Sequence, residues 1–543
     1  MEEKTFLLSQ SNANDIDYLI ISGEEYVHLL QPLITWKMQR GLRVSIETIE
    51  DIEDTYEGVD SAEQIRNCII EYHFNRNTLW VLLAGGPGIV PSRTLRVDDA
   101  IVSCDSYYSN LDDNWVLGDL YATLNDPDDW TPEVFVGRLP ADTRRQMISL
   151  VSRLIQYEQN PPVGSWMEHA VYAGTFANFD YDVNGNDIFD EEDSPAFDAN
   201  RNHNWMKEHL LPDGWTSTLL AENEGIRTTE YPYDLQINET SLVSSINEGA
   251  SIVMADAHGS PTGMIRSIFT NDVDGDTLFD FGTDEQDGIP FLTTSTMFDV
   301  NGKLGFYFLA ACSTGTFTEG TCLTESITRT SGIGCIGSSN SAYYDPSLIN
   351  YGGEEHLGWV TQGLSERVWE QILVQGHNRP GMALALAKDD YSSDKIQYDG
   401  EEDQGRTMAQ FNLMGDPEVP LWIGIPSAIE TPNITLDEQN REISIQLEGD
   451  LSSMTGISIT IQGTDYYQMI SFPSSGVGML NMPDLDESTN YTITLSQDGC
   501  VPLQITIELP AGAKFTGLYL IASIVIPGVV VLVMLMWYKF KKR

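Results

Sequence analysis

The sequence predicts an α/β region built on a parallel sheet, followed by an all-β sandwich and one C-terminal transmembrane helix. Three observations support this prediction. Strand-like apolar runs alternate with amphipathic helical runs from residue 16 to about 425, short alternating runs fill residues 429–509, and residues 515–538 carry no charge. A chain of 543 residues is also too long for a single hydrophobic core, so several domains are expected.

The first α/β subdomain is expected over residues 16–160. Its runs follow a βαβαβ order, which favours a parallel sheet with helices on its faces. The expected strands are 17–22, 42–49, 78–84 and 133–139, and the expected helices are 24–40, 61–72 and 143–157. The Gly-Gly-Pro-Gly run at 85–88 lacks the Lys-Ser/Thr pair of a phosphate-binding loop, so a tight turn is expected there.

A second α/β subdomain is expected over residues 161–425, and two of its strand-like runs end at reactive side chains. One run ends at His258-Gly259, and the other ends at Cys312. Ligands of open α/β sheets sit beyond the carboxyl ends of the strands. If these strands are parallel neighbours, an imidazole and a thiol meet at that edge. That pair is the minimum apparatus for thiolate acyl-transfer chemistry.

A catalytic thiol also needs backbone donors for the oxyanion. Gly259 lets the chain turn closely past His258, and the N–H groups of Gly259 and Cys312 can point at one carbonyl oxygen. The other cysteines show no zinc or disulfide-framework spacing, and most are expected to be small buried apolar residues. They are Cys68, Cys104, Cys322, Cys335 and Cys500.

These two segments belong to a wider set that resembles the gingipain-type cysteine peptidases (clan CD, caspase-like fold). The resemblance covers about residues 16–425 and includes YLIIS (18–22), LITWKMQRG (33–41), WVLLAGG (80–86), PEVFVGRLPA (132–141), LIQYEQNP (154–161), DAHGS (256–260), LAACSTG (309–315) and FNLMGDPEVPLW (411–422). It implies a caspase/gingipain-like catalytic unit of two subdomains, with His258 as general base and Cys312 as nucleophile.

The chain departs from this family beside the histidine. Some members carry an acidic residue that assists the histidine after the strand equivalent to 169–174, and here Ala177 and Asn178 occupy that place. Asp256 precedes His258 by two residues and is an alternative partner. The third catalytic group is therefore left open.

Charge is the most extreme feature of the composition. The chain has 29 Lys+Arg against 81 Asp+Glu, a net charge of −52. Such a surface repels nucleic acid and fits bound divalent cations, a high-salt or cell-surface habitat, or a cationic substrate. Arg-specific gingipains hold the substrate cation with an acidic residue, and the resemblance implies Asp198 or Asp193 for that substrate-binding role.

Two Asp-rich loops are expected to bind Ca²⁺, with a solvated acidic loop as the alternative. Residues 180–191 have the alternating oxygens, bend glycine and late carboxylate of an EF-hand-like loop, and residues 272–280 form a second cluster. Hard oxygen ligands favour calcium over a transition metal. The expected ligands are Asp180, Asp182, Asn184, Asn186, Asp187 and Glu191 in the first loop, and Asp272, Asp274, Asp276 and Asp280 in the second.

The C-terminal part combines a sandwich with a membrane span. Residues 429–509 predict an immunoglobulin-like β-sandwich, a domain that gingipains also carry after the catalytic unit. The uncharged run 515–538 predicts a single transmembrane helix, with the basic residues 539–543 on the cytoplasmic side.

The orientation rests on weaker signals. No signal peptide is recognisable, so the chain is either exported by a segment outside this sequence or tail-anchored with its bulk in the cytosol. The basic tail and the glycosylation sequons at Asn238, Asn433 and Asn490 favour an extracellular catalytic region.

Together these features predict a membrane-anchored cysteine endopeptidase of the cell surface, acting on proteins or peptides. Two alternatives stay open. The same fold can pass the acyl group to an amine, as a sortase-like transpeptidase does. The chain can also be a catalytically dead calcium-binding surface protein, although the intact HGS and AC segments favour an enzyme.

Overall fold

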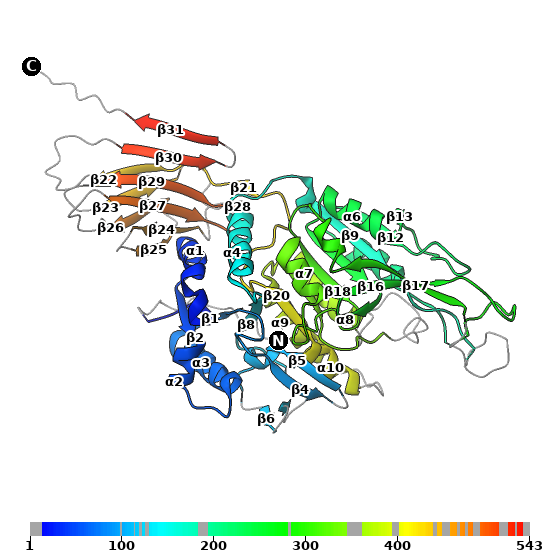
Figure 1. The fold of residues 1–543 in the computed structure, drawn as a ribbon. Helices are drawn as coiled ribbons and strands as arrows, with labels where there is room; N and C mark the ends of the chain where they lie inside the picture. The colour runs from blue at the N-terminus through cyan, green and yellow to red at the C-terminus, as the bar shows by residue number, and fades with distance from the viewer. Residues whose placement is uncertain are drawn as a thin grey trace, which may run out of the picture. The chain divides into compact units, whose positions relative to one another are not determined.

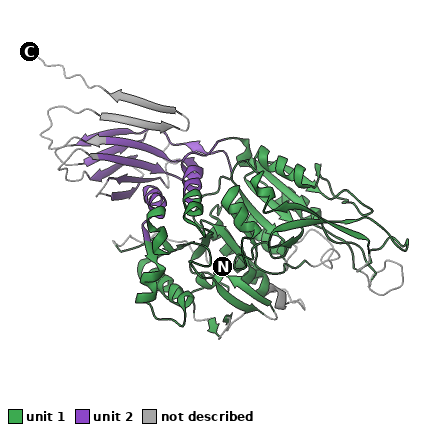
Figure 2. Ribbon diagram, in the orientation of Figure 1, with its two compact units in different colours: residues 1–29, 46–150, 164–423 green, residues 30–45, 151–163, 424–543 purple. Residues whose placement is uncertain are grey.

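The structure is a computed structural model of the chain. It describes residues 14–97, 100–112, 115–118, 122–124, 130–182, 194–280, 284–344, 361–393, 401–437, 442–447, 457–463, 467–472, 476–481, 489–509, 520–526 and 529–535. The chain forms two compact units (Figure 2). Unit 1 consists of Met1–Leu29, Ile46–Leu150 and Gly164–Ile423, and unit 2 of Leu30–Ser45, Val151–Val163 and Gly424–Arg543.

One eleven-stranded sheet forms the centre of unit 1 (Figure 1). Its strands, in order across the sheet, are β13 (Leu235–Gln236), β12 (Thr216–Ala221), β9 (His169–Gly174), β14 (Ile252–Asp256), β18 (Gly305–Ala310), β19 (Gly332–Ser338), β20 (Phe411–Gly415), β8 (Phe135–Leu139), β3 (Trp80–Ala84), β1 (Tyr18–Ser22) and β2 (Val44–Thr48). The described pairings are parallel, apart from the antiparallel pair of β19 with β20. The predicted parallel sheet is confirmed.

Helices cover both faces of this sheet, which explains why its central strands are apolar throughout. Leu309 of β18 faces a core shared with α6 and α7. The alternate side chains face other helices: the rings of Tyr172 and His203 (α5) lie 5.4 Å apart, and those of Phe306 and Trp369 (α8) lie 6.0 Å apart. The α-helices are α1 (Val27–Gln39), α2 (Ile49–Thr55), α3 (Ser61–Arg76), α4 (Arg144–Gln159), α5 (Asn200–His209), α6 (Glu239–Glu248), α7 (Leu323–Thr330), α8 (Thr361–Leu373), α9 (Pro380–Ser393) and α10 (Glu401–Gln410).

Three smaller sheets of unit 1 were not predicted from the sequence. Their strands are too short, or too irregular in pattern, to give a clear period-2 signal. They are β15 (His258–Ser260) with β16 (Gly263–Phe269) and β17 (Gln286–Thr293); β10 (Phe176–Asn178) with β11 (Phe197–Asp198); and β5 (Ala100–Cys104) with β4 (Arg93–Val97), β7 (Ala122–Leu124) and β6 (Trp115–Leu117).

Unit 2 contains two antiparallel sheets that share one hydrophobic core. Ile443 and Ile445 from the first sheet pack with Ile459, Ile493 and Ile505 from the second. The sheets are β22 (Asn433–Asp437), β23 (Glu442–Gln446) and β26 (Val477–Asn481); and β25 (Tyr467–Ser471), β24 (Ser458–Gln462), β27 (Thr489–Ser496), β29 (Leu503–Leu509), β30 (Leu520–Ile526) and β31 (Val529–Leu535). The predicted all-β module is present, and its immunoglobulin-like classification stays a prediction.

A buried charge cluster joins α1 to α4 within unit 2. Glu158 accepts hydrogen bonds from Trp36 Nε1 (2.9 Å), Lys37 Nζ (3.1 Å) and Arg40 Nη1 (2.7 Å). Lys37 and Glu158 are both almost fully buried. A buried carboxylate is tolerated because cations and a ring N–H satisfy it. Thr460 then donates to the last carbonyl of α1 (2.7 Å), a group that the helix itself leaves unpaired.

A transmembrane helix is expected over 515–538, but the part of this segment that the structure describes forms strands. Residues 520–526 and 529–535 are the strands β30 and β31, and the rest of the segment lies outside the described residues. The sequence offers a physical reason, since its Ile- and Val-rich halves suit strands and a Pro-Gly pair separates them. Among the described residues, no helix combines the length and the apolar character that crossing a bilayer requires.

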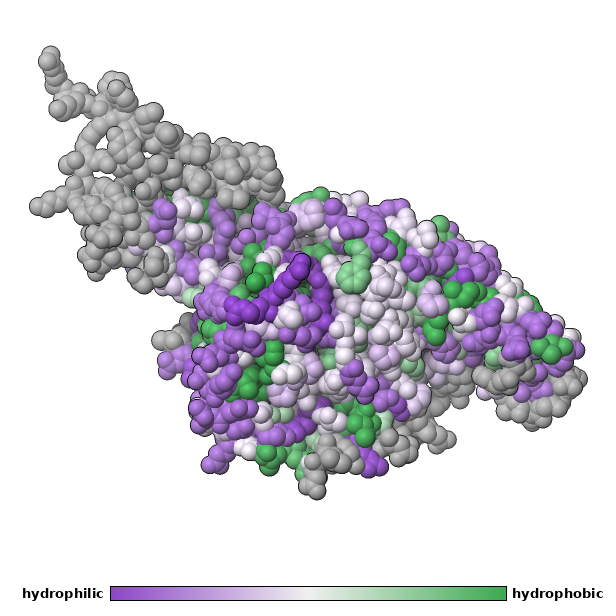
Figure 3. Space-filling view, in the orientation of Figure 1, coloured by the Kyte–Doolittle hydropathy of each residue, from purple (hydrophilic) through white to green (hydrophobic). Residues whose placement is uncertain are grey.

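The surface of the described residues is largely hydrophilic on the face that Figure 3 shows. Hydrophobic residues appear there as separate patches among hydrophilic ones. This pattern is ordinary for a folded protein of strong net charge.

Candidate active site

The two reactive side chains predicted from the sequence follow neighbouring strands. β14 and β18 pair in parallel, and their last residues, Asp256 and Ala310, are register partners. His258 and Cys312 each lie two residues beyond that last pair. Both are partly exposed, at the edge where ligands of parallel sheets bind. The two strands are therefore parallel neighbours, as predicted, and the segments that carry His258 and Cys312 leave the sheet at the same edge.

Gly259 brings the two segments into direct contact. A Cβ atom at Gly259 would lie 2.4 Å from the carbonyl oxygen and 3.0 Å from the nitrogen of Cys312. Any larger residue would push the backbone of Cys312 away. The predicted role of Gly259 as a close-approach residue thus has a steric basis.

The ring of His258 interacts with the backbone carbonyl of Ala177 on β10. Burial lowers the pKa of His258, and the Ala177 carbonyl partly offsets this because it favours the protonated ring. Tyr344 also donates its hydroxyl to the Ala177 carbonyl (3.2 Å). The position that is acidic in some gingipain-type enzymes is therefore occupied by a backbone acceptor.

Asp256 is directed to a different neighbour. Its carboxylate accepts a hydrogen bond from Gln362 Nε2 of α8 (2.9 Å), and it is 2% exposed. Burial raises the pKa of Asp256 to about 7, and the nearby charge of Asp198 adds to this shift. A carboxyl group that is half neutral near pH 7 is a weak partner for an imidazolium.

The thiol of Cys312 lies against the segment that follows β19. The N–H of Ala342 donates to Cys312 Sγ (3.3 Å), and the thiol can donate to the Ala342 carbonyl (3.5 Å). Ser313, the next residue, has φ 59° and donates its N–H to the Asn340 carbonyl (2.8 Å). This left-handed conformation changes the direction of the chain directly after Cys312.

Sequence reasoning missed this segment, residues 340–344. It contains neither a histidine nor a carboxylate, and its contribution is made by backbone groups. The only signal available was its position, just beyond the strand-like run at 332–337.

A cleft of about 180 Å³ is lined in part by residues of β10 and β11. Phe176 precedes Ala177 and lines the cleft, together with Phe197, whose ring packs 5.2 Å from that of Tyr344. Asp198, the residue implied for substrate binding, also lines it. Asp193 lies outside the described residues.

The carboxylate of Asp198 is already engaged. It accepts hydrogen bonds from the Asn200 N–H (3.0 Å), from Asn200 Nδ2 (2.9 Å) and from Thr229 Oγ1 (2.5 Å). Burial raises the pKa of Asp198, and these bonds oppose the shift.

Four of the remaining cysteines differ from Cys312 in burial. Cys68, Cys104, Cys322 and Cys335 are buried, as predicted, and burial raises the pKa of each thiol. A thiol that resists ionisation is a poor nucleophile.

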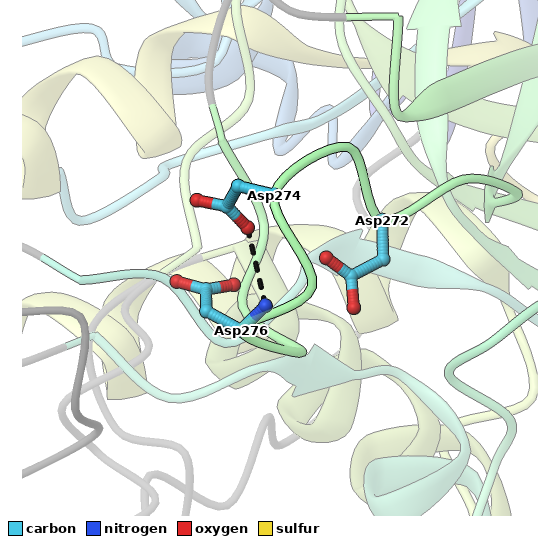
Figure 4. A group of neighbouring side chains, drawn as sticks. All are labelled: Asp272, Asp274 and Asp276. Carbon is cyan, nitrogen blue, oxygen red and sulfur yellow. Dashed lines mark hydrogen bonds between the residues drawn. The ribbon is translucent and has the colours of Figure 1, made fainter.

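The second Asp-rich loop forms a compact acidic cluster (Figure 4). Carboxylate oxygens of Asp272, Asp274 and Asp276 lie within 4.8 Å of one another, and the same holds for Asp274, Asp280 and Glu285. The Leu278 N–H lowers the pKa of Asp276, but partial burial and the neighbouring aspartates outweigh it, so the pKa is raised. Oxygens this close can hold a cation or must repel one another.

Glu285 is the member that sequence reasoning missed. It is fully buried and accepts hydrogen bonds from the N–H groups of Val273 (2.9 Å) and Asp280 (2.7 Å). These bonds fix the backbone of the loop from its buried side. It lies just beyond the expected 272–280 window, and only the fold of the loop brings it back.

The first Asp-rich loop is mostly outside the described residues. This applies to the expected ligands Asn184, Asn186, Asp187 and Glu191. Of the described members, Asp180 accepts from the Ala196 N–H (2.8 Å) and pairs with Arg227 (3.3 Å). Asp182 is partly buried nearby.

Comparison with known proteins gives a consistent result. The family model described as Peptidase family C25 matches residues 11–422. Gingipain R2 of Porphyromonas gingivalis is 22% identical over 487 residues, covering 88% of this chain and 55% of that protein. Lys-gingipain W83 of the same organism is 21% identical over 525 residues, covering 91% of this chain and 25% of that protein. The chain spans about half the length of gingipain R2.

Solved structures show the same fold. The crystal structure of the Arg specific cysteine proteinase gingipain R aligns with a TM-score of 0.60 at 16% identity, covering 92% of this chain and 99% of that one. A structure titled "Structure of Protease" aligns with a TM-score of 0.61 at 18% identity, covering 92% of this chain and 98% of that one.

Proposed function

Because the chain belongs to peptidase family C25, we propose that it is a cysteine endopeptidase in which Cys312 is the nucleophile and His258 the general base. The observation that carries this proposal is the contact of Gly259 with the backbone of Cys312, which places the base segment directly on the nucleophile segment. A buried core cysteine would need no such approach.

The proposed reaction has two halves. His258 takes the proton of the Cys312 thiol, and the thiolate sulfur attacks the carbonyl carbon of the scissile peptide bond. The C–N bond then breaks as the His258 imidazolium gives its proton to the leaving amine, which leaves a thioester. Water, deprotonated by His258, next attacks the thioester carbon and releases the acid and the thiol.

Backbone groups support both charges that appear in this scheme. The N–H groups of Gly259 and Cys312 are our candidates for holding the oxyanion. The Ala177 carbonyl favours the imidazolium, which is the role that a carboxylate plays in a triad. The dyad therefore works without a side-chain acid beside the ring.

We propose that the substrate side chain enters the cleft that Phe176 and Asp198 line. Asp198 supplies negative potential there while its own oxygens stay bonded to Asn200 and Thr229. Arg201 and Arg227 line the same cleft, so the −52 net charge of the chain is the stronger support for a cationic side chain.

Two further proposals concern the setting of the enzyme. The first is that the two acidic loops bind structural calcium. The described ligands include Asp272, Asp274 and Asp276. The uncharged segment 515–538, followed by a basic tail, holds the protein at a membrane with the catalytic region outside the cell. Protease shaving tests the second proposal: a catalytic region that is cut only after lysis contradicts it.

A thiol-directed acyloxymethyl ketone tests the catalytic proposal. The wild-type protein should be labelled and should cleave peptides, whereas Cys312→Ala should do neither and Cys68→Ala should do both. Labelling that persists in Cys312→Ala would refute the assignment. Addition of an amine acceptor during turnover separates hydrolysis from transpeptidation, since only the latter yields the amide.

A further inference from the structure

The segment 340–344 contacts Cys312 directly and contacts Ala177, the residue whose carbonyl interacts with His258. Ala342 donates its N–H to Cys312 Sγ, and Tyr344 donates its hydroxyl to the Ala177 carbonyl that faces His258. The position of this segment therefore decides the hydrogen bonding of the thiol and of the acceptor beside the base. The residues that hold this segment in place are distinct from the residues that perform the proposed reaction.

Asn340 anchors the start of the segment. Its carbonyl accepts from the Ser313 N–H (2.8 Å), and its Nδ2 donates to the Ile101 carbonyl of β5 (2.8 Å). Its Oδ1 accepts from the N–H of Ser341 (2.6 Å) and from Arg406 Nη2 (2.9 Å). The side chain is thus a junction between the segment, β5 and α10.

Arg406 of α10 holds the segment at two points. Besides Asn340, it donates through Nη1 to the Tyr343 hydroxyl, and its guanidinium carbon lies 4.7 Å from the centre of the Tyr343 ring. A planar guanidinium with several donors can fix an amide oxygen and a phenol at once, which a lysine cannot. Ala342 lies between these two residues, so its N–H is fixed from both sides.

The choice of partners is informative. In a chain of 81 carboxylates, Arg406 forms no ion pair with any residue that the structure describes. Its hydrogen bonds go to neutral groups of one segment instead. An arginine used this way contributes geometry more than charge compensation.

We propose that Arg406 is a positioning residue for the nucleophile: it locks residues 340–343 so that the Ala342 N–H stays on Cys312 Sγ and stabilises the thiolate. An N–H donor favours the ionised sulfur over the neutral thiol. This inference rests on the proposed function for its importance in catalysis, but the contact with the thiol can be tested without turnover.

The test measures two quantities in Arg406→Ala and Arg406→Lys. The first is the rate of Cys312 alkylation by iodoacetamide against pH, in a Cys500→Ser background, because Cys500 is the other partly exposed cysteine. The second is kcat and KM for a peptide, per active site titrated with the ketone. In Arg406→Ala we expect alkylation near pH 7 to slow about 10-fold and its pH midpoint to rise. We expect kcat to fall about 10- to 100-fold with KM little changed.

Two comparisons separate positioning from mere stability. Arg367→Ala on α8 removes a buried arginine that donates to the Gly363 carbonyl (3.0 Å) and lies over the Tyr391 ring (5.3 Å), so it should lower the melting temperature alone. Millimolar guanidinium should partly restore the alkylation rate of Arg406→Ala, because it can refill the vacated site, and Arg406→Lys should fall between the two.

The outcomes are distinct. An Arg406→Ala protein that melts earlier but keeps the wild-type alkylation profile and kcat overturns the inference. If that variant does not fold, Arg406→Lys with the same unchanged profile also overturns it. If the wild type cleaves no peptide while its alkylation profile depends on Arg406, the positioning inference stands and the proposed function fails.

Discussion

The edge that carries the proposed dyad and the acidic loop at 272–285 lie in the same unit but handle charge in opposite ways. At the dyad, charge appears only during reaction, and the groups ready to meet it belong to the backbone of Gly259, Ala177 and Ala342. In the loop, charge is present at rest, and its carboxylates face one another.

This difference teaches what each site needs from its surroundings. Backbone donors and acceptors cannot titrate away, so they can be set in place before the charge forms. Clustered side-chain charges repel until a cation or a proton arrives. The first site should therefore respond to changes in geometry, and the second to changes in ions.

The largest effect should come from the nucleophile itself. Cys312→Ala removes the thiol, so kcat/KM should fall by at least about 10³-fold. Cys335→Ala should only cost about 1–2 kcal/mol of stability, because Cys335 is fully buried in the core of the same sheet. Initial rates and thermal melts of both variants measure this contrast, and equal losses of activity would contradict it.

The next largest loss of activity should come from adding a single methyl group at Gly259. Gly259→Ala must displace the Cys312 backbone, because the new Cβ would lie 2.4 Å from its carbonyl oxygen. We expect kcat/KM to drop about 100-fold. Gly88→Ala is the matched control, since nothing lies within 4 Å of its added Cβ. If steady-state kinetics show Gly259→Ala to be as active as Gly88→Ala, the dyad does not depend on this approach.

The acidic loop should respond to ions with a moderate effect. Calcium should raise the melting temperature of the wild type by roughly 2–4 °C over the chelated protein. The double variant Asp274→Asn, Asp276→Asn should lose that response and melt later than the wild type in EGTA, because repulsion is relieved. Asp287→Asn, an exposed change on β17, should behave as the wild type. Identical calcium responses in the double variant and in Asp287→Asn would rule the site out.

The smallest effect concerns pH. Burial lowers the pKa of His258, so the ring stays neutral, and able to accept a proton, below its ordinary value of 6.5. As pH falls, the base is lost only when pH passes the lowered pKa. The acid limb of kcat/KM should therefore have its midpoint below 6.5. A pH–rate profile checks this, and a midpoint at or above the ordinary value would contradict the expected effect of burial.

The sequence by itself determined the chemistry-bearing residues and the sheet that carries them. Apolar runs that end at His258 and Cys312 are local signals, because strand period and composition are properties of a few consecutive residues. The same local logic explains why the all-β module was recognisable. The helix predicted over 515–538 differs from the strands described at 520–526 and 529–535, because an apolar run rich in β-branched residues suits a strand as well as a helix.

Tertiary structure alone decided how the site is completed. Ala177, Ala342 and Glu285 act through backbone position or through burial, and a residue's type does not report where its carbonyl points. Arg406 and Asn340 lie more than 60 residues apart in the sequence. They meet only because α10 packs beside β5. Local patterns fix which residues can react, whereas long-range packing fixes which neutral groups stand around them.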